Sequence, residues 1–139
     1  LGICIGCQIL LGHSEEGDED GVQGGTACLA ILPGRVKAFA PATGAASWKI
    51  PHMGWNTVRF TRPHRVLEGI PSGSHFYFVH SYYPDLDDPS SPLGVTDYAG
   101  VTFPAIYARS NMVACQFHAE KSGEVGLRLL KNFCEWDGT

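Results

Sequence analysis

The chain has 139 residues, of which 44% are hydrophobic and 17% charged, and its formal net charge is −4 at pH 7. This length is that of one globular domain, here 1–139, and the apolar content excludes a disordered chain. The 17 glycines and 9 prolines argue against a helical bundle. The acidic balance argues against a nucleic-acid partner, and no run reaches the roughly 18 apolar residues of a membrane-spanning helix. A mixed α/β or all-β domain remains.

The cysteine content and the first residue bear on location and completeness. Five cysteines are an odd number, and a domain of this size needs no disulfides to hold its core. We therefore expect reduced thiols and a cytoplasmic protein. The chain starts at Leu1 rather than Met, and its first motif is of a kind that follows a buried strand, so we expect an N-terminal truncation.

The N-terminal third predicts a short helix and two strands. Residues 1–11 have the pattern of a strand end, a turn bounded by glycines and a helix. The packed side of this helix should carry Ile5, Ile9 and either Leu10 or Leu11. The rest of this part should form an acidic loop at 15–21, strands at 27–32 and 36–38, and a small-residue loop at 40–46.

The remainder predicts antiparallel strands and one closing helix. Runs rich in aromatic and β-branched residues occupy 48–50, 57–60, 75–83, 94–98, 102–108 and 112–117. After Ser122, a good N-cap residue, apolar residues recur at helical spacing. These residues are Val125, Leu129, Phe133 and Trp136. We therefore expect an amphipathic helix at the C-terminal end.

The first candidate for chemistry is Gly2-Ile3-Cys4-Ile5-Gly6, which has the G-x-nucleophile-x-G form of a strained strand-to-helix turn. At the start of a helix, backbone N–H groups and the helix dipole would lower the pKa of the Cys4 thiol. Alone, the motif equally describes a buried structural cysteine beside packing glycines.

The second candidate is Gln116-Phe117-His118-Ala119-Glu120, which follows an apolar strand. In an extended segment residues i and i+2 project to one side, so Glu120 can accept a hydrogen bond from one ring nitrogen of His118. Alone, this describes a surface ion pair as well as a base with its orienting group. Together with Cys4, the three residues satisfy the logic of nucleophilic acyl transfer.

The joint pattern carries a family resemblance. The segment 2–8, with Cys4 and Gln8, and the segment Gln116-Phe117-His118-Ala119-Glu120-Lys121-Ser122-Gly123 resemble the triad-type, class I glutamine amidotransferases. Segments 51–56, 76–83 and 126–133 are similar to glutaminase subunits of imidazole glycerol phosphate synthases. The resemblance runs from end to end. It implies an α/β, flavodoxin-like three-layer domain whose N-terminal strands are missing, and it requires no metal or organic cofactor.

The resemblance also implies roles for individual residues. Cys4 would attack the side-chain amide of glutamine, His118 would move the protons, and Glu120 would hold the imidazole. The N–H of Ile5 would be one oxyanion donor. Substrate contacts would come from Gln8 and Glu16, with neighbouring Glu15 leaving the register open. The wall around bound glutamine would comprise Tyr77, His80, Ser81 and Tyr82, although an aromatic strand is more often core.

A protein partner is implied as well. The unusual element Pro51-His52-Met53-Gly54-Trp55-Asn56, with Lys121 nearby, would dock on a (β/α)8-barrel cyclase in a heterodimer. The cyclase would use the ammonia to make imidazole glycerol phosphate and AICAR in histidine biosynthesis. Without the resemblance, Trp55 is equally well explained as a buried core partner of Trp48.

Four other interpretations stay open. Cys4, Cys7, Cys115 and His118 spell a Cys3His zinc set, and Cys4-x-x-Cys7 has the spacing of a redox pair. The chain can also be a non-catalytic docking domain. Within enzymes, the alternative is a class I amidotransferase or γ-glutamyl hydrolase of another pathway.

Overall fold

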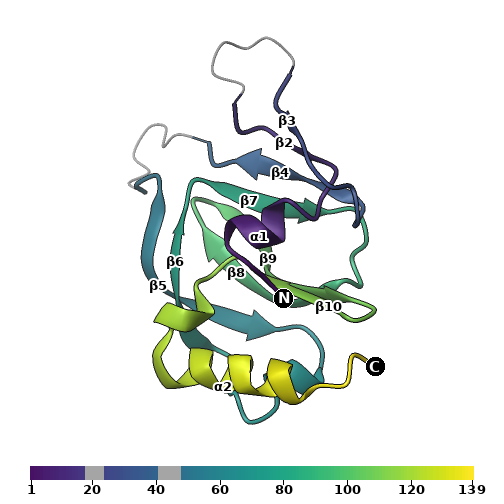
Figure 1. Ribbon diagram of the computed structural model, residues 1–139. Coiled ribbons are helices and arrows are strands. Elements are labelled where there is room, and N and C mark those ends of the chain that lie inside the picture. The colour runs from purple at the N-terminus through teal and green to yellow at the C-terminus, as the bar shows by residue number, and fades with distance from the viewer. Residues whose placement is uncertain (18–23, 41–47) are drawn as a thin grey trace.

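The computed structural model describes residues 1–17, 24–40 and 48–139, and within these ranges the strands form two sheets (Figure 1). The six-stranded sheet has the order β1-β10-β9-β8-β5-β6. Its strands are β1 (Gly2–Ile3), β10 (Met112–Cys115), β9 (Val101–Arg109), β8 (Pro92–Tyr98), β5 (His52–Phe60) and β6 (Ser74–His80). The four-stranded sheet has the order β3-β2-β4-β7. Its strands are β3 (Thr26–Ala27), β2 (His13–Ser14), β4 (Gly34–Ala38) and β7 (Tyr82–Leu86).

Helices complete the described fold. They are α1 (Ile5–Gln8), the long α2 (Gly123–Glu135), and the short 3-10 turns η1 (Arg65–Leu67) and η2 (Ala119–Lys121). Strands β1 and β10 pair in parallel, as do β2 and β4, whereas the other strand pairs of the described chain are antiparallel. The mixed α/β architecture is therefore confirmed. None of the described helices combines the length and the apolar character needed to cross a membrane.

The main core lies between the six-stranded sheet and α2. Phe76, Phe78, Phe103 and Phe117 are fully or almost fully buried there, and Leu129 of α2 packs into the same cluster. Figure 1 shows α2 running beside η1 and the ends of β5 and β6. The predicted helical spacing is confirmed, because Val125, Leu129, Phe133 and Trp136 all join this core.

Several strand predictions are confirmed and others are wrong. The runs 94–98, 102–108 and 112–117 correspond to β8, β9 and β10. The run 27–32 forms a strand only at Ala27, because the backbone N–H groups of residues 29–32 bond to carbonyls of residues 9–11 instead. The helical face was also misassigned, since Ile5 and Ile9 are 57% and 41% exposed while Leu11 is buried.

The centre of the chain departs most from the prediction. Residues 48–50 form no strand, and His52 to Phe60 form one continuous strand, β5. The run 75–83 is divided at Ser81 between β6 of one sheet and β7 of the other. The predicted loops at 15–21 and 40–46 lie partly outside the described residues, which omit 18–23 and 41–47.

Candidate active site

Cys4 occupies a strained turn between β1 and α1. Its φ of 52° lies in the left-handed region, which is unusual for a residue with a side chain. The turn is tight, because a Cβ added at Gly2 would lie 2.6 Å from the carbonyl oxygen of Gly6. A Cβ at Gly6 would meet no described atom within 4 Å. The predicted elbow is therefore present, and the first of its two glycines is the one that close approach requires.

The parallel pairing of β1 with β10 brings the two predicted motifs together. Ile3 lies opposite Cys115, and the N–H of Cys4 donates to the carbonyl of Cys115 at 2.9 Å. The two motifs then follow the carboxyl ends of these two parallel strands, which is where α/β folds gather functional residues. The N–H of His118 donates to the carbonyl of Tyr77 at 2.8 Å, so the histidine is also tied to β6.

His118 and Glu120 form the predicted hydrogen bond, with 2.6 Å between Nδ1 and Oε1. The backbone explanation was wrong, because β10 ends at Cys115 and Glu120 lies in the 3-10 turn η2 rather than in an extended strand. Nδ1 donates to the carboxylate, and Nε2 makes no hydrogen bond within the described residues. The imidazole therefore has an orienting partner on one side and a nitrogen available for proton transfer on the other.

Electrostatics set the charge states of the acid and the thiol. Partial burial of Glu120 opposes ionisation, but the hydrogen bond from His118, a backbone N–H and the nearby positive charge of Lys121 outweigh it and hold the pKa of Glu120 below its usual value. The pKa of the Cys4 thiol is raised, mainly by burial and further by the charges of Glu120 and Glu16. The backbone N–H of Ile5 acts in the opposite direction. The N–H at the start of α1 therefore lowers the pKa of Cys4 as predicted, but desolvation outweighs it, and the net shift is upward.

A cavity of about 170 Å³ lies beside α1. It is lined by Ile5, Gln8, Ile9, Ser14, Glu16, Gly17, Thr26 and Cys28. The structure distinguishes the two neighbouring glutamates. The carboxylate of Glu15 accepts the N–H of Ala38 at 2.7 Å, at the end of β4, whereas Glu16 lines the cavity. Two of the predicted substrate residues, Gln8 and Glu16, therefore share one cavity.

The side chain of Gln8 is buried, and its amide nitrogen is fully engaged. Nε2 donates to the carbonyl of Tyr82 at 2.9 Å and to Oε1 of Gln116 at 2.8 Å. An amide nitrogen has two N–H donors, so both are used within the protein. Only the Oε1 atom of Gln8 remains to meet a ligand in the cavity.

The predicted wall residues do not lie on one surface. His80 is 6% exposed; its Nδ1 donates to the carbonyl of Tyr82 at 2.7 Å, and its Nε2 lies 2.8 Å from Nδ1 of His52. Both ring nitrogens are thus used inside the protein. Ser81 and Tyr82 are half-buried beyond the end of β6. Tyr77 lies on the outer face of β6, where its ring contacts Trp55 at a centroid distance of 6.0 Å.

The element 51–56 has two faces because its residues from His52 onward belong to strand β5. Met53 and Trp55 point outward and are 62% and 56% exposed, and Pro51 and Lys121 are exposed too. His52 is 3% exposed, and Gly54 and Asn56 are partly buried. The structure therefore divides the predicted docking element into an outer face and an inner one.

Sequence reasoning missed two functions of nearby side chains. Ser122 stands at the N-cap position of α2, but it makes no side-chain capping bond. Its hydroxyl donates to the carbonyl of His118 at 2.6 Å and accepts the N–H of Tyr77 at 3.0 Å, which joins β6 to the segment that carries His118. Gln116 is fully buried against Cys4 and Gln8. The position of Gln116, two residues before the candidate base, was the one available signal.

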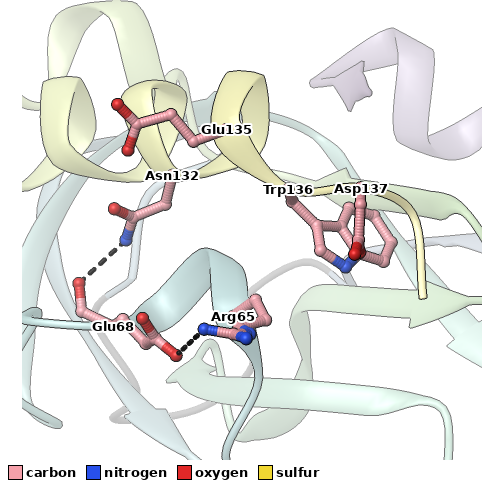
Figure 2. Close-up of a pocket in the computed structure, with 6 residues that line it drawn as sticks. All are labelled: Arg65, Glu68, Asn132, Glu135, Trp136 and Asp137. Carbon is pink, nitrogen blue, oxygen red and sulfur yellow. Dashed lines mark hydrogen bonds and ion pairs between the residues drawn. The ribbon is translucent and has the colours of Figure 1, made fainter.

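Two further features bear on the other interpretations. A second cavity, of about 220 Å³, lies between α2 and η1, where Asn132 donates to the carbonyl of Glu68 at 2.8 Å and Arg65 pairs with Glu68 (Figure 2). The bond from Asn132 fastens α2 to the end of η1, and the cavity contains none of the predicted site residues. Across the described ranges, no three His, Cys, Asp or Glu side chains gather as metal ligands.

Comparison with known proteins shows what the chain is similar to. The family profile described as glutamine amidotransferase class-I matches residues 1–136. A protein of Desulfitobacterium hafniense named imidazole glycerol phosphate synthase subunit HisH is 49% identical over 136 residues, which are 98% of this chain and 59% of that protein.

Relatives with the same name come from distant organisms. The protein from Methylococcus capsulatus is 50% identical over 141 residues, covering 99% of this chain and 62% of that protein. The protein from Archaeoglobus fulgidus is 49% identical over 133 residues, which are 96% of this chain and 61% of that protein. The chain spans about three fifths of the length of these curated relatives.

Proposed function

Because the chain belongs to the class-I glutamine amidotransferase family, we propose that it is the glutamine-hydrolysing part of an imidazole glycerol phosphate synthase. The observation that carries this proposal is the position of Cys4, in a left-handed turn paired with the strand that leads to the hydrogen-bonded His118 and Glu120. A nucleophile, a base and an orienting carboxylate are the parts that acyl transfer needs. The similarity to three synthase subunits supports the choice of pathway.

The chemistry follows from the charge states. Burial raises the pKa of Cys4, so the thiol gives its proton to Nε2 of His118 as the sulfur attacks the side-chain amide carbon of glutamine. The same proton then goes to the departing nitrogen, which leaves as ammonia and a γ-glutamyl thioester remains. Water, deprotonated by His118, hydrolyses the thioester to glutamate. Glu120 stabilises the imidazolium in both halves, and the N–H of Ile5 donates to the oxyanion.

The charged end of the substrate would occupy the cavity beside α1, whose lining includes Gln8 and Glu16 but not Cys4. Oε1 of Gln8 is an acceptor for an N–H of glutamine, and the carboxylate of Glu16 is an acceptor for its charged amino group. Since His80 uses both ring nitrogens internally, it would support this site through the carbonyl of Tyr82 rather than touch the substrate.

A barrel-shaped cyclase would cover the outer face of β5 and β6. Exposed Met53 and Trp55 offer the apolar and aromatic surface typical of an interface centre, and Lys121 supplies a charge at its edge. Met53 also lines a hollow of about 570 Å³ with Trp48, Lys49, Ile50, Pro51 and Tyr98. The pair would act as a cytoplasmic heterodimer that passes ammonia from one subunit to the other.

The test is glutamine hydrolysis by the full-length gene product, with and without a cyclase subunit. We expect release of ammonia and glutamate that rises with the cyclase and disappears in Cys4→Ala. Cys134→Ala, at an exposed position on α2, is the matched control and should keep full activity. Hydrolysis that ignores the cyclase would indicate an amidotransferase or hydrolase of another pathway. No hydrolysis under either condition would overturn the proposal.

A further inference from the structure

Gln116 is a fully buried amide next to the nucleophile. Its Nε2 lies 3.8 Å from Sγ of Cys4, within hydrogen-bonding range for sulfur. Its Oε1 accepts from Nε2 of Gln8 at 2.8 Å and from the thiol of Cys7 at 3.6 Å. With two donors directed at Oε1, the side chain has only its N–H groups to offer Cys4.

The orientation of this amide follows from a fixed acceptor elsewhere in the chain. The carbonyl of Tyr82 can only accept, so the Gln8 atom 2.9 Å away from it must be nitrogen. The same nitrogen lies 2.8 Å from Gln116, whose facing atom must therefore be oxygen. The remaining end of Gln116, directed at Cys4, is then the nitrogen.

The Tyr82 carbonyl is itself held from the other side. Nδ1 of His80 donates to it at 2.7 Å, and Nε2 of His80 accepts from Nδ1 of His52. Nε2 of His52 in turn lies 3.3 Å from Nδ2 of Asn56. One assignment of donors and acceptors thus satisfies every group in this hydrogen-bond network, from Asn56 in β5 to Cys4. Reversing the side-chain amide of Gln8 or of Gln116 alone would put two donors or two acceptors face to face.

We propose that Gln116 is a hydrogen-bond donor to the reacting sulfur of Cys4, and that Gln8 and the Tyr82 carbonyl are positioning groups that aim it. This inference rests on the proposed role of Cys4 as nucleophile. An N–H donor binds a thiolate more strongly than a thiol, because hydrogen bonds to charged acceptors are the stronger ones. Gln116 therefore favours the reactive form of Cys4, against the burial that disfavours it.

The test measures the rate of Cys4 alkylation by iodoacetamide as a function of pH, in the full-length gene product without glutamine. Peptide mass spectrometry separates Cys4 from the other thiols. Gln116→Glu keeps the shape but replaces the donor with a charged acceptor. We expect alkylation about tenfold slower at neutral pH and a midpoint about one pH unit higher, with the rate recovering at high pH. Gln116→Met should shift the midpoint in the same direction by less.

Controls separate this role from a general packing effect. Cys7→Ser keeps a donor to Oε1 of Gln116 and keeps the backbone N–H that donates to the carbonyl of Cys4, so it should leave the midpoint unchanged. An unchanged midpoint in folded Gln116→Glu and Gln116→Met would overturn the proposal. If neither variant folds, Gln8→Met decides, because it removes the donor that orients Gln116 and should also raise the midpoint. An unchanged midpoint there would equally overturn it.

The readout is independent of glutamine turnover. Shifted alkylation in a protein that hydrolyses no glutamine would support the role of Gln116 and contradict the proposed function. Normal hydrolysis with an unshifted midpoint in the variants would contradict the role of Gln116 alone.

Discussion

Strands β5 and β6 place His52 directly opposite His80, with 2.8 Å between Nδ1 of His52 and Nε2 of His80. Both side chains are buried among aromatic rings that include Phe39, Phe78 and Phe103. Desolvation is the main cause that lowers the pKa of His52 to about 4 and that of His80 to about 3. Both imidazoles are therefore neutral at physiological pH, and the neutral state of His80 lets its Nε2 accept the hydrogen bond from Nδ1 of His52.

The pair predicts a loss of stability in acid. The unfolded histidines bind protons below about pH 6.5, whereas the folded ones stay neutral to about 4 and about 3. The contribution to stability is thus complete above about pH 6.5 and is lost as the pH falls toward the folded values. Each histidine contributes a slope of up to about 1.4 kcal/mol per pH unit. Urea unfolding between about pH 8 and pH 4 measures it. A slope unaltered in His80→Gln would contradict this assignment.

Removing the charge of Glu120 should raise the rate of Cys4 alkylation and lower the rate of glutamine hydrolysis. The charge of Glu120 helps to raise the pKa of Cys4, so Glu120→Gln should speed Cys4 alkylation at neutral pH. Glutamine hydrolysis should fall about 10²- to 10⁴-fold, because His118 loses the partner that stabilises its cation. Glu124→Gln, at an exposed acid in the first turn of α2, is the control and should change neither rate. Slower alkylation in Glu120→Gln would refute the electrostatic argument.

The two N–H donors of Gln8 predict that Gln8→Glu and Gln8→Met lower the free energy of unfolding by different amounts. Gln8→Glu would set a carboxylate against the carbonyl of Tyr82 and Oε1 of Gln116, both of which are acceptors. We expect its free energy of unfolding to fall by about 1–3 kcal/mol more than that of Gln8→Met, which brings no charge into the site. Denaturant unfolding of both variants at neutral pH gives the difference. Equal stabilities would mean that the Gln8 amide bonds contribute little.

The contact between α2 and η2 predicts a steric effect on η2, the turn that carries Glu120. A Cβ at Gly126 would lie 1.9 Å from the carbonyl oxygen of Ala119 and 2.8 Å from Cβ of Ser122. Gly126→Ala should therefore displace the turn that carries Glu120, lower the free energy of unfolding by about 1–3 kcal/mol and slow glutamine hydrolysis. Leu127→Ala, at the adjacent exposed position, should leave both near normal. A fully active, fully stable Gly126→Ala protein would show that the helix can shift freely.

The sequence alone was enough to predict the α/β class, the family, the Cys4 turn, the pairing of His118 with Glu120 and the final helix. Whole-chain composition indicated the class, and the other features have short-range signatures: glycines two positions either side of a nucleophile, polar residues two apart after a strand, or apolar residues at helical spacing. The family resemblance drew on the same local strings. Such signals survive without knowledge of the packing, because the atoms that create them are close along the chain.

Only the tertiary structure decided how these parts are aimed. The bonds of Gln8 to Tyr82 and Gln116 span 74 and 108 residues, so no local pattern reports which N–H groups remain for a ligand. The burial of His52 under a face that exposes Trp55 depends on one continuous strand where the composition had not predicted one. Burial of the Cys4 thiol outweighed the N–H at the start of α1 and reversed the expected direction of its pKa shift. Local chemistry names the reacting groups, but burial and long-range hydrogen bonds set their charge and orientation.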